Sequence, residues 1–331
     1  MSFKRKWVSR LKFAAVCASV IGLFFIVQQI QAKALAAKFH SVQWTWFALA
    51  VLIFGALFIP AAARWRIALR ASGASVRFVA AALIALIGHF FYTILLGAAG
   101  GDTAKSLLYS RWHRVPVTTT LAASSLDRIL GLGGLVLFMS IALVLGFSGG
   151  GFGEAGKVSL RWSAGWLAGV IVIAAAAIFW LKRSPQDSPQ RHFLRTLKAG
   201  GRRLLASRAD LWSGVACGIA VQAALSGVLA LCLAAVSSEP IPWARLAWTF
   251  PLISIISALP ITFAGLGVRD TAAVTLFSLY HVDPATAVAA SLLAAAVSLI
   301  WAVAGAALLW WQALRHEMRQ PFRSVLAAVP R

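Results

Sequence analysis

The segment Ala258-Leu-Pro-Ile-Thr-Phe-Ala-Gly-Leu-Gly-Val-Arg-Asp270 interrupts an otherwise apolar part of the chain. Pro260, Gly265 and Gly267 weaken a helix at this point. The charged pair Arg269–Asp270 follows directly. In a bilayer, backbone groups freed by such a break need partners, and charged side chains are tolerated only where they face other protein groups or water. We therefore expect a broken helix at membrane depth that carries a candidate binding site.

A second segment, Gly97-Ala-Ala-Gly-Gly-Asp-Thr-Ala-Lys105, has the same order of features. Gly100 and Gly101 lead into Asp102, much as Gly267 shortly precedes Asp270. The two aspartates are 168 residues apart, since 270 − 102 = 168. We predict a second backbone break at this glycine pair.

The composition is that of a membrane protein. Of the 331 residues, 60% are hydrophobic and 12% are charged, and the mean hydropathy is +0.83. A soluble domain cannot bury so much apolar surface. The net charge of +22 would suggest nucleic acid as a partner of a soluble protein. Here the Lys and Arg residues stand at the ends of apolar runs, which is typical of the cytoplasmic loops of membrane proteins. We expect a multi-pass protein of a bacterial inner membrane with no nucleic acid partner.

Eight apolar runs stand out, at about 13–30, 44–63, 79–98, 121–147, 163–181, 211–236, 243–263 and 285–311. If each run crossed the membrane once, starting from a cytoplasmic N-terminus, two basic segments would lie outside the cell. One is around Arg111 and the other is over 182–210. Short loops rich in Lys and Arg stay in the cytoplasm. If 79–115 enters from the cytoplasm and returns to it as a re-entrant helical hairpin, both basic segments become cytoplasmic. A second re-entrant hairpin over 243–283, entered from the outer face, keeps the basic C-terminus inside.

The predicted fold is an all-α polytopic membrane protein with six full spans and two re-entrant helical hairpins, in a single transmembrane domain over 1–331. Its halves, 13–147 and 163–311, each contain three spans and one hairpin, so the second half begins on the opposite face and the repeat is inverted. We expect an external loop over 148–162, a basic cytoplasmic connector over 182–210 and two cytoplasmic termini. Inverted repeats with broken helices near the midplane are found in many secondary transporters.

The charged residues of the two broken segments have alternative interpretations. Asp102 and Asp270 follow glycine-containing stretches at the start of helical patterns, where a carboxylate can cap the helix. Helix N-termini also attract anionic ligands, so capping and ligand contact can coexist. Arg269 is suited to bidentate contact with a phosphate. Structural pairing with an acidic residue explains it equally well.

Asp127 and Arg128 are adjacent on one predicted helix, so their side chains point about 100° apart and cannot simply neutralise each other. Pairing of Asp127 with Lys105 or Arg111 is the favoured interpretation, and contact with a lipid headgroup is the second. His89, in an apolar run, is expected to be a hydrogen-bonded interior residue.

We find no catalytic motif: no HExxH, GxSxG or Walker sequence and no metal-spaced His/Cys set. The three cysteines lie in apolar runs without CxxC spacing, which is typical of small interior residues. We expect no catalytic residues, no metal and no cofactor.

Gly100-Gly101-Asp102, Asp127-Arg128 and Leu259-Pro260-Ile261…Gly265-Leu266-Gly267-Val268-Arg269-Asp270 together resemble the transmembrane domain of the lysylphosphatidylglycerol synthase/flippase family, over essentially the whole chain. In members that carry a synthase, this domain is thought to move aminoacylated phospholipid across the bilayer. The chain departs from the family pattern at Asp270, where Glu is usual, and at Ser291–Ala294, which lacks a basic residue often present there. It ends at Arg331 without a soluble synthase domain, so we do not expect aminoacylation.

The resemblance implies a lipid translocase. We expect it to bind a phosphate-bearing headgroup between the two hairpins, near Asp102, Arg128, Arg269 and Asp270. Membrane lipids are the expected partners, and a partner membrane protein or a homo-oligomer is left open. The first alternative is a membrane enzyme, or an accessory subunit of one, for lipid-linked sugars or isoprenoid lipids. The second is a structural membrane protein whose polar residues only stabilise the fold.

Overall fold

The computed structural model describes residues 32–94, 98–148, 189–237, 248–257 and 268–327. These residues form helices and turns, with no strand among them. The helices are α2 (Ala32–His40), α3 (Trp44–Ala56), α4 (Phe58–Ala71), α5 (Phe78–Ile94), α6 (Ala98–His113), α7 (Val117–Ser148), α9 (Pro189–Ala206), α10 (Arg208–Val236), α12 (Thr249–Ser257), α13 (Val268–Ser278) and α14 (Pro284–Ala327).

Four apolar helices are long enough to cross a membrane: Trp44–Ala71, which joins α3 to α4, Val117–Val144, Arg208–Val236 and Pro284–Gln312. Each has 28 or 29 residues. At a rise of 1.5 Å per residue this is about 42 Å, which exceeds the hydrocarbon core of about 30 Å. The prediction of an all-α, multi-pass membrane protein is confirmed.

Several predicted features lie outside the described residues. They are the spans over 13–30 and 163–181, the external loop over 148–162 beyond its first residue, and the proposed break residues Pro260, Gly265 and Gly267. The segment predicted as the first hairpin corresponds to α5 and α6, which pack against each other. The second corresponds in part to α12 and α13, which are also in contact.

Glycines allow the helices to approach closely. A Cβ atom on Gly134 of α7 would lie 2.5 Å from the carbonyl carbon of Gly218 of α10. A Cβ atom on Gly101 of α6 would lie 2.9 Å from the carbonyl oxygen of Gly88 of α5. Both distances are too short for any side chain, so these crossings depend on glycine.

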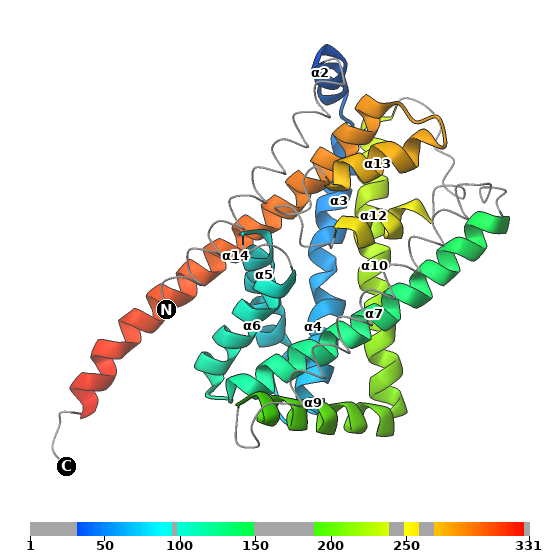
Figure 1. Cartoon of the computed structure of the whole chain (residues 1–331). Coiled ribbons are helices and arrows are strands. Elements are labelled where there is room, and N and C mark those ends of the chain that lie inside the picture. The colour runs from blue at the N-terminus through cyan, green and yellow to red at the C-terminus, as the bar shows by residue number, and fades with distance from the viewer. Residues whose placement is uncertain (1–31, 95–97, 149–188, 238–247, 258–267, 328–331) are drawn as a thin grey trace, which may run out of the picture.

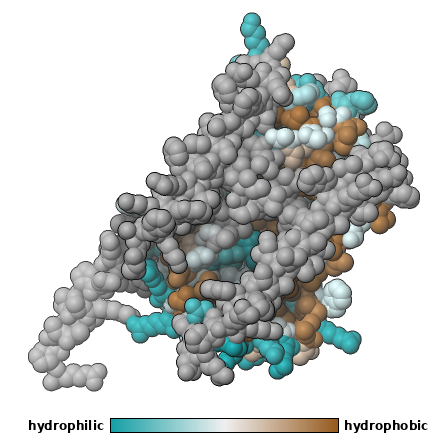
Figure 2. All heavy atoms as spheres, in the orientation of Figure 1, coloured by the Kyte–Doolittle hydropathy of each residue, from teal (hydrophilic) through white to brown (hydrophobic). Residues whose placement is uncertain are grey.

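One end of the molecule, which we call the basic end, is formed by the end of α4 and the start of α7, with α9 lying across it (Figure 1). Arg203 of α9 donates a hydrogen bond from Nη1 to the carbonyl oxygen of Ala71, at 3.0 Å. Thr118 Oγ1 lies 2.9 Å from His192 Nδ1, which ties α7 to α9. Figure 2 shows hydrophilic residues gathered at this end. The exposed residues of α9 include four basic ones: Arg195, Lys198, Arg202 and Arg203.

The α5–α6 pair begins and ends on one side of the molecule. The hydroxyl of Tyr109, near the end of α6, donates a hydrogen bond to the carbonyl oxygen of Ser75, just before α5, at 2.8 Å. Ser75 follows the end of α4, so both ends of the pair lie near the basic end.

The α12–α13 pair also begins and ends on one side of the molecule, at the end opposite the basic end. Trp248, just before α12, donates from Nε1 to the hydroxyl oxygen of Tyr280, just after α13, at 2.8 Å. The start of α3 and the end of α10 also meet at this end, since the N–H of Gln43 donates to the carbonyl oxygen of Ala235 at 2.8 Å. The two helix pairs therefore have their ends at opposite ends of the bundle.

Candidate functional site

A cavity of about 170 Å³ lies among α4, α5, α6 and α7. Small and apolar residues such as Ala61 and Gly88 form part of its wall. Seven polar or charged residues complete the lining: Arg64, His89, Tyr92, Asp102, Lys105, Asp127 and Arg128. An apolar bundle therefore contains a charged cavity.

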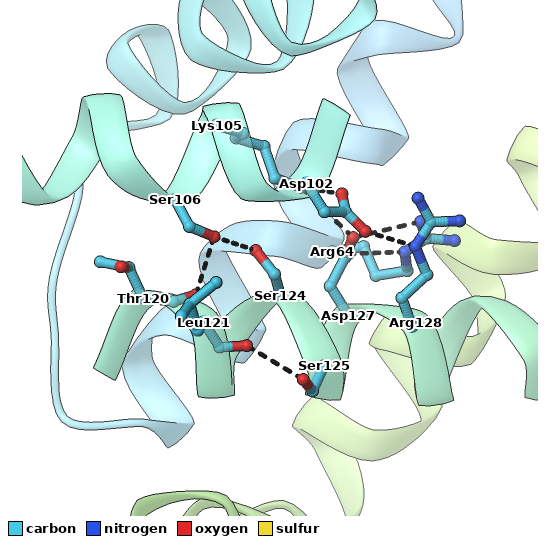
Figure 3. A network of polar contacts seen from close by, with 10 residues as sticks. All are labelled: Arg64, Asp102, Lys105, Ser106, Thr120, Leu121, Ser124, Ser125, Asp127 and Arg128. Atoms are coloured by element: carbon cyan, nitrogen blue, oxygen red, sulfur yellow. Dashed lines mark hydrogen bonds and ion pairs between the residues drawn. The ribbon is translucent and has the colours of Figure 1, made fainter. Parts of the chain in front are cut away.

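Asp127, on α7, is buried at the centre of this charged set (Figure 3). Arg64, on α4, donates a hydrogen bond from Nε to Oδ1 of Asp127 at 2.8 Å. Lys105, on α6, has its Nζ atom 3.6 Å from Oδ2 of the same carboxylate. One carboxylate thus joins three helices, and the opposite charges compensate the cost of removing each from water.

Asp102, on α6, is the second acidic residue. Its Oδ1 atom lies 3.4 Å from Nζ of Lys105, and its Oδ2 atom accepts a hydrogen bond from Nε of Arg128 (Figure 3). The charges alternate through the series Arg64, Asp127, Lys105, Asp102 and Arg128, which we call the cavity cluster. Three cations and two anions leave a net charge of 3 − 2 = +1. Such a cluster favours a ligand with one negative charge.

Hydrogen bonds and a cation–π contact hold the cavity cluster in position. Ser106 Oγ on α6 lies 2.8 Å from Ser124 Oγ on α7, and it also donates to the carbonyl oxygen of Thr120 (Figure 3). The Nζ atom of Lys105 lies 4.9 Å from the centroid of the Trp65 ring, which is a cation–π contact. These contacts restrict where the charged groups of α6 and α7 can lie.

The structure distinguishes between the interpretations of Asp102. The residue is the fifth of α6, and its carboxylate contacts Lys105 and Arg128, so it does not cap the start of the helix. Gly100 and Gly101 lie within the first turn of α6, just after its start at Ala98. Gly101 serves helix packing at this point, because a side chain would collide with α5.

The expectations for the residues around Asp127 agree with the contacts. Asp127 and Arg128 take different partners: Arg64 pairs with Asp127, and Arg128 pairs with Asp102. The predicted pairing of Asp127 with Lys105 is present. His89 is hydrogen-bonded in the interior, with Nε2 3.1 Å from the carbonyl oxygen of Ser298 on α14.

The apolar run predicted over 44–63 stops just before Arg64, and the sequence analysis did not place Arg64 among the site residues. The helix continues to Ala71, and only 13% of the Arg64 side chain is exposed. An arginine lowers the local hydropathy although a helix tolerates it well, so an apolar run predicted from hydropathy ends before the helix does. The informative signal was the pair of small residues on the same helical face, Ala61 three positions before and Ala68 four positions after.

Arg269, Asp270 and Ser291 form a separate group, which we call the Ser291 cluster. Arg269 donates from Nε to Ser291 Oγ at 2.9 Å, and the Ser291 hydroxyl donates to Oδ1 of Asp270. Arg269 Nη2 lies 3.6 Å from the same oxygen. Asp270 is fully buried in the first turn of α13, where the helix dipole favours a negative charge. The serine thus bridges the two charges.

The five predicted site residues therefore fall into two groups. Asp102, Asp127 and Arg128 line the described cavity, whereas Arg269 and Asp270 do not. In the described part of the chain, no three His, Cys, Asp or Glu residues lie close enough together to hold a metal ion.

A bundle of membrane-spanning helices with a compensated charge cluster inside it defines a multi-pass membrane protein with an internal polar site. Residues 11–307 match the family described as Lysylphosphatidylglycerol synthase TM region, and the chain belongs to this family. The resemblance detected in the glycine-aspartate motifs is confirmed. No curated protein matches the chain. The family and the spanning helices make this a membrane protein of lipid metabolism or transport.

Proposed function

We propose that the protein moves a lipid with a phosphate-bearing polar headgroup across the bacterial inner membrane. The observation that carries this proposal is the charged cavity inside the helix bundle. Charged side chains at membrane depth are costly and are typically retained along substrate pathways. The headgroup would occupy the cavity while the acyl chains remain in the surrounding lipid.

Arg128 is the residue that a headgroup would meet first. About 49% of its side chain is exposed, compared with 20% for Asp102 and 9% for Lys105. A guanidinium group can bind two phosphate oxygens at once. The net charge of +1 supports a headgroup with a single negative charge, such as a phosphodiester.

We infer that α5–α6 and α12–α13 are re-entrant hairpins. With 17 residues, α5 is about 25 Å long, and α6, with 16 residues, is about 24 Å long, so each is shorter than the hydrocarbon core. The ends of each pair meet, through Tyr109 and Ser75 in one and through Trp248 and Tyr280 in the other. Their location at opposite ends of the bundle supports an inverted repeat, whose halves would move against each other to alternate access. The basic end would face the cytoplasm.

Transport by purified protein in liposomes tests the proposal. A fluorescent phospholipid in the inner leaflet becomes accessible to an external quencher only after translocation. We expect wild-type protein to move the lipid and Arg128→Gln to lower the rate at least about tenfold, because a charged hydrogen bond to the headgroup is lost.

The matched control is Arg70→Gln. Arg70 also forms an ion pair with an aspartate, Asp210, at 2.9 Å, but this pair is exposed and does not line the cavity. The Arg70→Gln variant should move the lipid at the same rate as wild type. If wild-type protein moves none of a panel of anionic and zwitterionic lipids, the translocase proposal is wrong and a partner-dependent enzyme becomes the better hypothesis. Equal rates in wild type and Arg128→Gln would remove the cavity as the headgroup site.

A further inference from the structure

Two buried polar atoms in the middle of α10 have no hydrogen-bond partner among the described residues: Oε1 of Gln222 and Oγ of Ser226. Only 7% of Ser226 is exposed. The helix runs from Arg208 to Val236, so both residues lie near the centre of a membrane span. Unpaired polar atoms at this depth are costly, so such residues point to a ligand that pairs with them.

The two residues lie between the two charged clusters. Gly214 packs on Leu130 of α7, three residues after Asp127 of the cavity cluster. Cys232 belongs to the same buried cluster as Ala272 and Ala273 of α13, which follow Asp270 of the Ser291 cluster. Gly214 and Cys232 are 18 residues apart, since 232 − 214 = 18, which corresponds to about 27 Å along the helix. A lipid headgroup that moves along α10 from one cluster to the other passes the midpoint of the helix, where Gln222 and Ser226 lie.

The position also fits the packing of α10. The four-residue spacing of Gly214, Gly218, Gln222 and Ser226 aligns them along one stripe of the helix. The first two pack on α7, where a Cβ atom on Gly214 would lie 2.7 Å from Cδ1 of Leu130. The stripe therefore changes from tightly packed glycines to polar side chains at the centre of the span.

We propose that Gln222 and Ser226 form a hydrogen-bonding site for the hydroxyl groups of a lipid headgroup, midway between the two charged clusters. This inference rests on the proposed function and specifies its substrate class. Oε1 of Gln222 only accepts hydrogen bonds, so its partner must be a donor, whereas the Ser226 hydroxyl both donates and accepts. Headgroup hydroxyls satisfy both atoms. A phosphate monoanion without hydroxyls offers acceptors only, so the preferred substrate carries hydroxyls in addition to its phosphate.

The test compares two acyl-labelled lipids of equal charge in liposomes: phosphatidylglycerol, which has two headgroup hydroxyls, and phosphatidylmethanol, which has none. Wild-type protein should move phosphatidylglycerol faster. Gln222→Leu and Ser226→Ala should each lower that rate about tenfold and leave the phosphatidylmethanol rate unchanged. The melting temperatures of both variants should equal or exceed that of wild type, because each substitution removes an unpaired buried polar atom. Ser213→Ala, at an exposed position of the same helix, is the matched control.

Three results would overturn the inference: equal effects on both lipids, no effect on either, or a lower melting temperature in both variants. If wild-type protein moves neither of these lipids nor any other lipid of the anionic and zwitterionic panel, the proposed function fails, and the site is then tested by binding. Phosphatidylglycerol should raise the melting temperature of the detergent-solubilised protein more than phosphatidylmethanol does, and Gln222→Leu should abolish the difference. The site is rejected if wild type and Gln222→Leu show the same difference in melting temperature between the two lipids. It is also rejected if wild type shows no difference.

Discussion

Arg64 and Asp127 are 63 residues apart in the chain, yet Nε of the arginine lies 2.8 Å from Oδ1 of the aspartate. This ion pair joins α4 to α7 inside the bundle, and Lys105 of α6 approaches the same carboxylate from a third helix. The pair therefore contributes both to the fold and to the charge of the cavity.

Removal of Asp127 alone should destabilise the protein strongly. In Asp127→Ala, both Arg64 and Lys105 lose their shared carboxylate while they stay largely buried. Loss of one partner of a buried ion pair typically costs about 3–5 kcal/mol. Chemical unfolding in detergent, followed by circular dichroism, measures this loss.

The double variant Arg64→Leu/Asp127→Leu is the control for that prediction. Replacing a buried pair by apolar side chains of similar volume is often close to neutral, so we expect it to be more stable than Asp127→Ala. A double variant as unstable as the single one would show that the pair is not the source of the stability.

Neighbouring glycines of α7 should respond differently to alanine. A Cβ atom at position 134 would lie 2.5 Å from the backbone of Gly218, so Gly134→Ala must force α7 and α10 apart. Overpacking of this kind costs about 1–3 kcal/mol. The added methyl group of Gly133→Ala would meet Val215 Cγ2 at 3.6 Å, an ordinary contact, and should not destabilise the protein. The melting temperatures of the two variants, measured side by side, check the predicted crossing.

Ser291 should be necessary for the stability of its cluster. In Ser291→Ala, the hydroxyl that contacts both Arg269 and Asp270 is lost, and a fully buried carboxylate loses a hydrogen-bond donor. We expect a loss of about 1–3 kcal/mol in the free energy of unfolding. Ser278→Ala, which removes an exposed hydroxyl bonded only locally to Thr275, should have almost no effect. Equal stability of the two variants would contradict the proposed bridging role.

The two ends of the bundle should be accessible from opposite sides of the membrane. A cysteine introduced at Arg195, on the exposed face of α9, should react with an impermeant maleimide only after the cells are opened. A cysteine at Ala36, on α2 at the other end, should react in intact cells. Both variants are made in a background without the native cysteines. External labelling at position 195 would reject the re-entrant arrangement.

The sequence alone determined the class of protein and much of its secondary structure. Hydropathy and the spacing of apolar residues are local properties, so α7, α10 and the start of α14 could be predicted within a few residues. The glycine-aspartate motifs, together with Asp127-Arg128, were sufficient to identify the family.

Only the tertiary structure decided which charges meet. Arg64 belongs to the cavity because the α4 helix continues to Ala71 and packs against α7, and no local pattern contains that contact. Asp102 and Asp270 both follow glycine-containing stretches of the sequence, yet one lines a cavity and the other is buried with Ser291. The reason is physical: an ion pair depends on the position of a partner on another helix, and that position is set by the packing of the whole bundle.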